Sequence, residues 1–310
     1  MESRFQWQQW VRKNRLGVVL LALIAGFVYY LYFVQIVNPY RHTTYTWLVG
    51  HWRMVSHYTH GPLIPLIALW LLWWKRAELL RAAVRPHNGG LPIVALAMLF
   101  YYLGLKGGQE RLLVLSFVVL LYGLTLAVGG RELLRVAFFP ITFLLLMIPL
   151  NFLEERVAVP LQHLMAICST AVLNMLGVPA QRVGTGIYSS EFQFHVDTPC
   201  SGIQSLMALT TVTAAYAYVT LRQQWKRWAL FLSAIPLAVL GNMARVILVA
   251  LVAQVYGQNL AMQLHDTAAG YIVFAVALVL MVLFGLALEF PYRRWWDYWT
   301  KPIEPKQVPS

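Results

Sequence analysis

The sequence predicts an all-α membrane protein with about eight transmembrane helices and a small β-hairpin on its outer side. Three observations predict this fold class. The 310-residue chain is 59% hydrophobic and only 12% charged, whereas a soluble domain carries about 25% charged residues. Long apolar segments alternate with short polar links, as in chains that cross a bilayer repeatedly. The basic residues lie mainly in every second link, which is the arrangement that orients membrane proteins.

The first apolar segment, 16–37, follows Arg12, Lys13 and Arg15. Its length of about 22 residues exceeds the apolar core of a signal peptide, and no small-residue cleavage site follows it. We therefore expect an uncleaved signal anchor that crosses the membrane, with the N-terminus in the cytoplasm.

Seven further apolar segments predict spanning helices, and several of them must extend into flanking residues to reach the ~20 residues that a span needs. These segments are 60–75, 91–105, 112–128, 134–150, 201–220, 228–256 and 270–289. An additional segment, 157–177, is apolar but interrupted, and it predicts an interfacial or re-entrant helix. Residues 1–300 are thus expected to form a single transmembrane domain, followed by a disordered, proline-containing tail over 301–310.

The 24 Lys and Arg residues support eight spans with both termini in the cytoplasm. In that arrangement 17 of them lie in cytoplasmic links, six lie in outer links, and Arg245 lies inside a span. An odd number of spans would scatter these charges over both sides. The net charge of +12 therefore reflects topology. Because no basic face with interleaved aromatic residues is present on a soluble segment, we predict no nucleic-acid binding.

Residues 183–197 alternate apolar and polar side chains around Ser189 and Ser190, a pattern typical of two strands joined by a turn. This predicted hairpin lies on the outer side. It leads directly into Pro199 and Cys200, where an extended segment gives way to a predicted helix.

Cys200 is the candidate nucleophile of the chain. It stands between Pro199 and the pair Ser201 and Gly202, so first-turn amides and the helix dipole would lower the pKa of its thiol. The alternative is a small residue that packs at a helix start. The second cysteine, Cys168, is interpreted as a packed helical residue.

Arg245 lies within the predicted helix 228–256, about 16 Å from its outer end at 1.5 Å per residue. An arginine in a spanning helix costs roughly 2.5–3.5 kcal/mol on insertion scales, so it should face the bundle interior and have a partner. Asn242, on the same helical face, is placed to orient it. The alternatives are an arginine that extends outward to the interface, or an ion pair, for example with Asp266, that only holds helices together.

His265 precedes the last predicted helix and is followed by Asp266. The predicted topology places His265 at the depth of Cys200, where an imidazole can transfer the proton that acyl transfer requires. Asp266 is then expected to orient the imidazole. The alternative is a merely polar interfacial histidine.

Four other histidines share one outer loop, but their spacing matches no zinc signature and no acidic ligand accompanies them. They are His42, His51, His57 and His60. We therefore predict no metal site and no cofactor.

Four blocks of sequence, in order and spacing, resemble the exosortase/archaeosortase group of membrane transpeptidase-like enzymes. The blocks are residues 59–67 (which include His60), 199–203, 242–246, and His265 with Gly270. The resemblance covers roughly residues 55–290. It implies that the family's proposed catalytic cysteine, arginine and histidine correspond to Cys200, Arg245 and His265. We expect Asn242, Asp266, His60, Ser201 and Gly202 to support them.

The resemblance also implies the biological setting. Such enzymes act in the bacterial inner membrane on secreted proteins, with the active site toward the periplasm, and are linked to exopolysaccharide production. Their substrates end in a Pro-Glu-Pro-type motif, one hydrophobic helix and a basic tail, and membrane lipid surrounds both partners. The chain differs from some relatives at Pro62, where an aromatic residue is common.

The sequence thus favours a cysteine protease or transpeptidase that cleaves a C-terminal sorting signal through a thioester on Cys200. Two alternatives stay open. One is a polytopic transporter or lipid-handling protein in which Arg245 binds an anionic group. The other is a non-catalytic assembly subunit of an envelope polysaccharide system.

Overall fold

The computed structural model describes residues 15–53, 58–149, 151–195, 203–264 and 270–290. It is 79% helical with one small sheet, which confirms the predicted helical fold class. The chain divides into two compact units, Met1–Asn151 and Phe152–Ser310. The predicted disordered tail, 301–310, lies outside the described residues.

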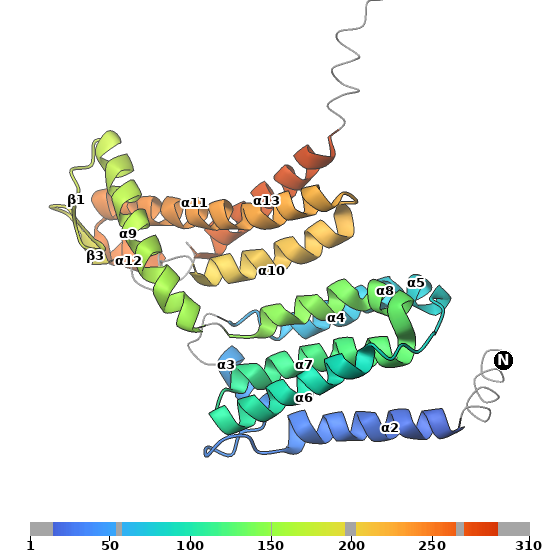
Figure 1. Cartoon of the computed structure of the whole chain (residues 1–310). Helices are drawn as coiled ribbons and strands as arrows, with labels where there is room; N and C mark the ends of the chain where they lie inside the picture. The colour runs from blue at the N-terminus through green and yellow to red at the C-terminus, as the bar shows by residue number, and fades with distance from the viewer. Residues whose placement is uncertain (1–14, 54–57, 150, 196–202, 265–269, 291–310) are drawn as a thin grey trace, which may run out of the picture. The chain divides into compact units, whose positions relative to one another are not determined.

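The first unit is entirely helical among its described residues, apart from one isolated β-bridge (Figure 1). Its elements are α2 (Arg15–Tyr29), the π-helical turn η1 (Tyr30–Val34), α3 (Thr44–Arg53), α4 (Leu63–Trp74), α5 (Arg76–Arg81), α6 (Gly90–Gly107), α7 (Glu110–Leu124), the π-helical turn η2 (Thr125–Gly129), α8 (Gly130–Phe143) and the 3₁₀ turn η3 (Leu144–Met147).

Helices α6 and α7 form the centre of the first unit. Their backbones approach closely at Gly90 and Gly123, since a Cβ on Gly90 would stand 2.6 Å from the carbonyl oxygen of Gly123. Only glycine allows that approach. Two tyrosine hydroxyls attach η1 to this pair, because Tyr32 contacts the Ser116 hydroxyl at 2.7 Å and Tyr101 donates to the Leu31 carbonyl at 2.9 Å.

The helical stretch from Glu110 to Met147 folds back on itself near Gly130, whose φ is +84°. The rings of Tyr122 and Phe138 lie 5.6 Å apart, and the Tyr122 hydroxyl bonds to that of Thr142. Residues 122 and 142 would be about 30 Å apart in one straight helix. The stretch therefore forms two antiparallel arms, which carry the predicted segment 112–128 and the predicted segment 134–150 as far as Met147.

Among its described residues, the second unit combines five helices with the sheet (Figure 1). Its elements are α9 (Asn151–Met175), β1 (Gln181–Val183), β2 (Gly186–Tyr188), β3 (Gln193–His195), α10 (Ile203–Thr220), α11 (Gln224–Tyr256), α12 (Gln258–Leu264) and α13 (Gly270–Glu289).

Helices α10, α11 and α13 pack together in the second unit around a buried apolar cluster. Three contacts define one antiparallel register between α11 and α13. Gly270 lies against Arg245, Gly241 lies against Val273, and Gly285 lies against Leu230. Because residue numbers in these pairs rise on α11 as they fall on α13, the start of α13 lies beside the C-terminal half of α11.

The sheet has three antiparallel strands in the order β1-β2-β3, whereas the sequence predicted a single hairpin over 183–197. The additional turn falls at Gly184, whose φ of +63° suits glycine, and Val183 pairs with Gly186 across it. The predicted first strand is therefore divided by a tight turn. The second turn runs through Ser189, whose N–H bonds to the carbonyl of Phe192.

Five helical stretches among the described residues have the length and hydropathy to cross a membrane, so the predicted count of eight is not established by this criterion. They are Gly90–Gly107, Glu110–Met147, Arg156–Met175, Gln224–Tyr256 and Gly270–Glu289. The predicted spans 16–37 and 60–75 fall on shorter apolar helices, Ala22–Val34 and Leu63–Trp74.

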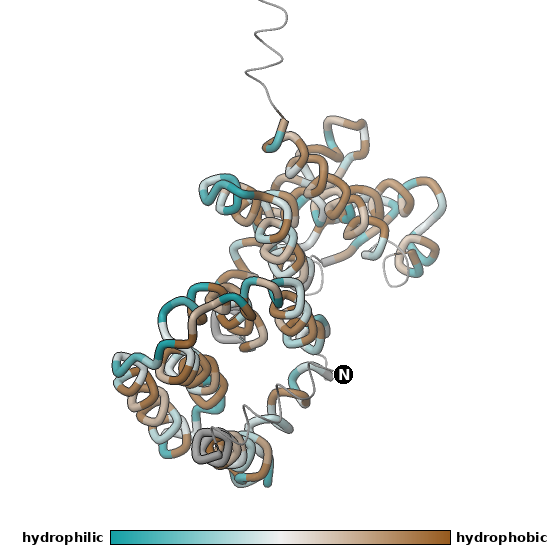
Figure 2. The backbone as a smooth tube through the Cα atoms, turned by 90° about the vertical axis from the view of Figure 1, so that its right-hand side faces the viewer, coloured by the Kyte–Doolittle hydropathy of each residue, from teal (hydrophilic) through white to brown (hydrophobic). Residues whose placement is uncertain are grey.

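The predicted interfacial segment 157–177 falls in α9, which continues without interruption past its internal residue Pro160. The apolar residues of both units run along the helices, and hydrophilic residues gather in the links (Figure 2). In the most apolar 18-residue stretch of α13, only 17% of the residues are buried. Such an exposed apolar surface is stable in lipid and costly in water.

Candidate functional site

Arg245 is positioned by α11, eleven residues before the helix ends at Tyr256. Its guanidinium lies against Gly270, the first residue of α13: a Cβ built there would stand 3.6 Å from both Cζ and Nη1 of Arg245. Because Gly270 has no side chain, the start of α13 borders one side of the guanidinium at van der Waals distance. In sequence, His265 precedes this contact by five residues.

The start of α10 lies at a similar height along α11 to Arg245 and the start of α13. Helices α10 and α11 are antiparallel and are joined by the short link 221–223. Near this link, Tyr216 of α10 and Leu230 of α11 both approach Gly285. The 18 residues of α10 rise about 27 Å, which brings Ile203 level with about Asn242 on α11.

This register matters because Cys200 precedes Ile203 by only three residues in the sequence. The beginnings of α10 and α13 are both found beside the part of α11 that carries Asn242 and Arg245. In the sequence, these two helix starts directly follow the segments that contain Cys200 and His265.

Asn242 is buried at 2% exposure, and its Nδ2 donates to the carbonyl of Ala238 at 2.8 Å. This bond holds the amide on the inner face of α11, within one turn of Arg245. The predicted role of Asn242 in orienting the guanidinium remains a prediction.

The sheet packs against the C-terminal half of α11. Ile187 and Phe192 are buried in one cluster with Val249 and Ala253 of α11 and with Met165 of α9. A buried cluster of this kind fixes β2 and the turn before β3 against the helix.

A second contact holds β3 itself. The side chain of Gln258, at the start of α12, donates from Nε2 to the carbonyl of Gln193 at 2.9 Å. Strand β3 ends at His195, five residues before Cys200. Sequence reasoning gave Gln258 no role, because a glutamine after Gly257 carries no pattern that indicates a distant backbone partner.

Five of the predicted site residues lie outside the described residues. They are Cys200, Ser201, Gly202, His265 and Asp266. Within the described ranges, no three His, Cys, Asp or Glu side chains are close enough together to hold a metal ion.

His60 lies in the first unit, in the turn that precedes α4. Its ring stacks on Tyr58 at 5.7 Å, and its buried Nδ1 has no hydrogen-bond partner among the described residues. Burial lowers the pKa of His60 from 6.5 to about 4, so the imidazole is neutral at pH 7. Next to it, Gly61 leaves room for the indole of Trp52, which a Cβ would approach to 2.2 Å.

These features define a multi-pass membrane protein with a half-buried arginine on one of its long apolar helices, in contact with the beginning of a neighbouring helix. Intramembrane ionisable residues of this kind usually mark functional sites.

A family model described as transmembrane exosortase matches residues 52–283, well over half of the chain. The chain therefore belongs to the transmembrane exosortase family, as its sequence blocks predicted. Membership in this family indicates a membrane transpeptidase or protease role. Comparisons with curated proteins and with solved structures found no match.

Proposed function

We propose that this protein is a membrane-embedded cysteine protease or transpeptidase that removes the C-terminal sorting signal of secreted proteins. Family membership supports the reaction class. The observation that carries the proposal is the contact between Arg245 and Gly270 beside the beginning of α10. It supports the proposal because Cys200 and His265 precede the first residues of α10 and α13 by only three and five positions in the sequence.

In the proposed reaction, the Cys200 thiolate attacks the carbonyl carbon of the scissile peptide bond. The carbon–nitrogen bond breaks, a thioester forms, and His265 gives a proton to the departing amine. Water or an amine acceptor then attacks the thioester, His265 takes its proton, and the thiolate is released. The first acceptor gives hydrolysis and the second gives transpeptidation.

Arg245 is assigned to the oxygen of the attacked carbonyl, where negative charge develops. A guanidinium stabilises that oxyanion strongly in a site of low dielectric from which water is excluded. In our proposal Asn242 and Asp266 orient Arg245 and His265, and the amides of Ser201 and Gly202 favour the thiolate. We propose a further supporting role for His60, which is neutral at pH 7.

The proposed substrate is a secreted protein that ends in a Pro-Glu-Pro-type motif, a hydrophobic helix and a basic tail. Its helix would lie in the bilayer beside the enzyme, with the basic end in the cytoplasm. This orientation presents the motif on the outer side of a bacterial inner membrane, and it connects the enzyme to envelope and exopolysaccharide export.

The test is co-expression with a secreted reporter that carries such a tail. We expect wild-type enzyme and the control Cys168→Ala to shorten the reporter, while Cys200→Ala leaves it intact at an equal level in the membrane. Cys168 is the matched control because it is the other cysteine and lies on α9 as a free thiol.

The same assay separates the alternatives. Processing that survives Cys200→Ser but is lost in Arg245→Ala would contradict thioester chemistry. It would favour a transporter or lipid-handling protein in which Arg245 binds an anionic group.

A further inference from the structure

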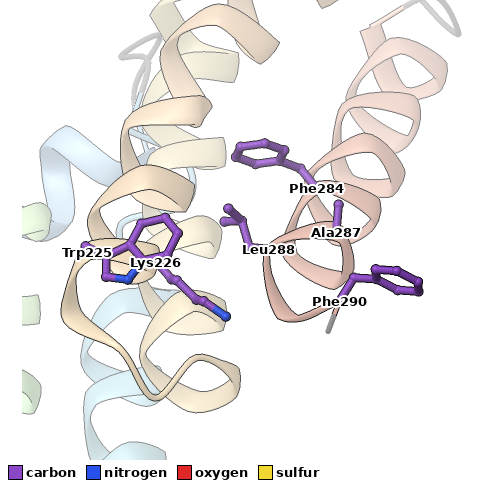
Figure 3. A pocket seen from close by; sticks show the side chains of 6 residues that line it. All are labelled: Trp225, Lys226, Phe284, Ala287, Leu288 and Phe290. Atoms are coloured by element: carbon purple, nitrogen blue, oxygen red, sulfur yellow. The ribbon is translucent and has the colours of Figure 1, made fainter. Parts of the chain in front are cut away.

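A cavity of about 280 Å³ lies between the first turn of α11 and the last turns of α13 (Figure 3). We call it the α11–α13 groove, and it is lined by Trp225, Lys226, Phe284, Ala287, Leu288 and Phe290. Its volume is just below the roughly 300–1,000 Å³ of typical small-molecule sites. All of its lining residues except Lys226 are apolar or aromatic, so the groove suits one hydrocarbon chain better than a polar metabolite.

Lys226 supplies the charge of the groove. Its side chain is only 14% exposed and extends between the two helices, as Figure 3 shows. The Nζ atom lies 3.6 Å from Oε1 of Glu289, which is an ion pair too long for a hydrogen bond. The ammonium therefore keeps donors for a second anion.

Two other cations lie close in the sequence but do not line the groove. Arg227 donates to the carbonyl of Leu221 at 2.8 Å and lies over the ring of Tyr218. Arg222 is exposed in the link between α10 and α11. Together the three cations outnumber Glu289, so the surroundings of the groove attract anions.

The groove lies at the depth expected for lipid headgroups. It is formed by the ends of α11 and α13, two helices long enough to cross a membrane. Trp225 and Trp228 are each 61% exposed at this end of α11, and exposed tryptophans gather at the membrane–water interface. This is also the end that the loop charges predict to be cytoplasmic.

We propose that the α11–α13 groove binds an anionic phospholipid. One acyl chain would lie against Phe284 and Leu288, and the phosphate would accept hydrogen bonds from Lys226. Basic pockets between transmembrane helices on the cytoplasmic side bind anionic headgroups in this way. A basic peptide tail is a poor occupant, because Lys226 and its neighbouring arginines would repel it.

The test is native mass spectrometry of the full-length protein in detergent, with phosphatidylglycerol or phosphatidylcholine added. We expect phosphatidylglycerol to be retained in preference to phosphatidylcholine. Lys226→Gln, which removes the ammonium, and Ala287→Phe, which fills the groove, should each weaken phosphatidylglycerol binding about fivefold. Arg222→Gln is the matched control: it removes a nearby exposed cation outside the groove and should leave binding within about twofold.

Glu289→Gln separates a lipid site from a purely structural ion pair. A structural pair predicts that Glu289→Gln and Lys226→Gln act alike, since each breaks the pair. A lipid site predicts opposite effects, because removing Glu289 frees the ammonium and should strengthen phosphatidylglycerol binding about fivefold.

Three results would overturn the proposal. The first is equal retention of both lipids. The second is equal weakening by Lys226→Gln and Arg222→Gln, which indicates diffuse attraction. The third is a basic tail peptide that binds the wild-type protein but not Ala287→Phe, while both proteins bind phosphatidylglycerol equally.

Discussion

Replacing Gly270 with leucine tests whether the contact at Arg245 matters for the proposed reaction. A Cβ at this position would stand 3.6 Å from Cζ of Arg245, which is ordinary contact, so Gly270→Ala should be tolerated. A leucine carries three further carbons into the same space. The guanidinium would then have to move by about 1 Å or more, since carbon atoms approach no closer than about 3.5 Å without repulsion.

A displacement of about 1 Å in a catalytic group can reduce the rate about 100-fold. We therefore expect kcat/KM for reporter cleavage to fall about 100-fold in Gly270→Leu, equivalent to about 2.7 kcal/mol of transition-state stabilisation. The fall in Gly270→Ala should be at most about threefold. Folding should be little affected, because the displaced group is the end of a flexible side chain.

The assay measures initial cleavage rates in detergent or proteoliposomes, with enzyme amounts matched by folded protein. The control is Tyr271→Leu, at a neighbouring residue that is 81% exposed. A Gly270→Leu enzyme as active as Tyr271→Leu would refute the reasoning, because the position of the guanidinium would then not limit the reaction.

Three further predictions follow from the described residues and from the candidate nucleophile. Burial lowers the pKa of His60 to about 4, against 6.5 in the unfolded chain, so the unfolded chain takes up the proton first as the pH falls. The folded protein should therefore lose stability as the pH is lowered from 6.5 to 4. His60→Gln should show a weaker dependence of melting temperature on pH. Gly61→Ala places a Cβ 2.2 Å from the Trp52 indole and should reduce the free energy of unfolding by about 1–3 kcal/mol, measured by thermal or denaturant unfolding. Cys200 should react with a thiol reagent faster than Cys168 near neutral pH, and equal slow labelling would contradict a lowered thiol pKa.

Much of the fold could be predicted because hydropathy alone separates helices from links in a membrane protein. The apolar length of the segments 91–105 and 270–289 was enough to predict a helix in each, and the structure has α6 and α13 there. The sheet was harder. The alternation over 183–197 indicated strands, but the position of the first turn depended on the positive φ of Gly184.

The candidate site was less accessible from the sequence. The depth of Arg245 could be counted along its helix, but its contact with Gly270 depends on how α11 and α13 pack. Twenty-five residues separate the two positions, and no local pattern sets that register. The pair of Lys226 and Glu289 was missed for the same reason, since its members are brought together only by the same antiparallel packing.

Helix α10 begins well short of the C-terminal end of α11, and this has a consequence for the substrates that the proposed enzyme can accept. Ile203 is level with about Asn242, and α11 continues for 14 residues beyond it, a distance of about 21 Å. A peptide that entered from the outer end of α11 would span this distance with about six extended residues. A folded domain fused more closely to its sorting motif would be held out of reach, so the length of unfolded chain before the motif would itself select substrates.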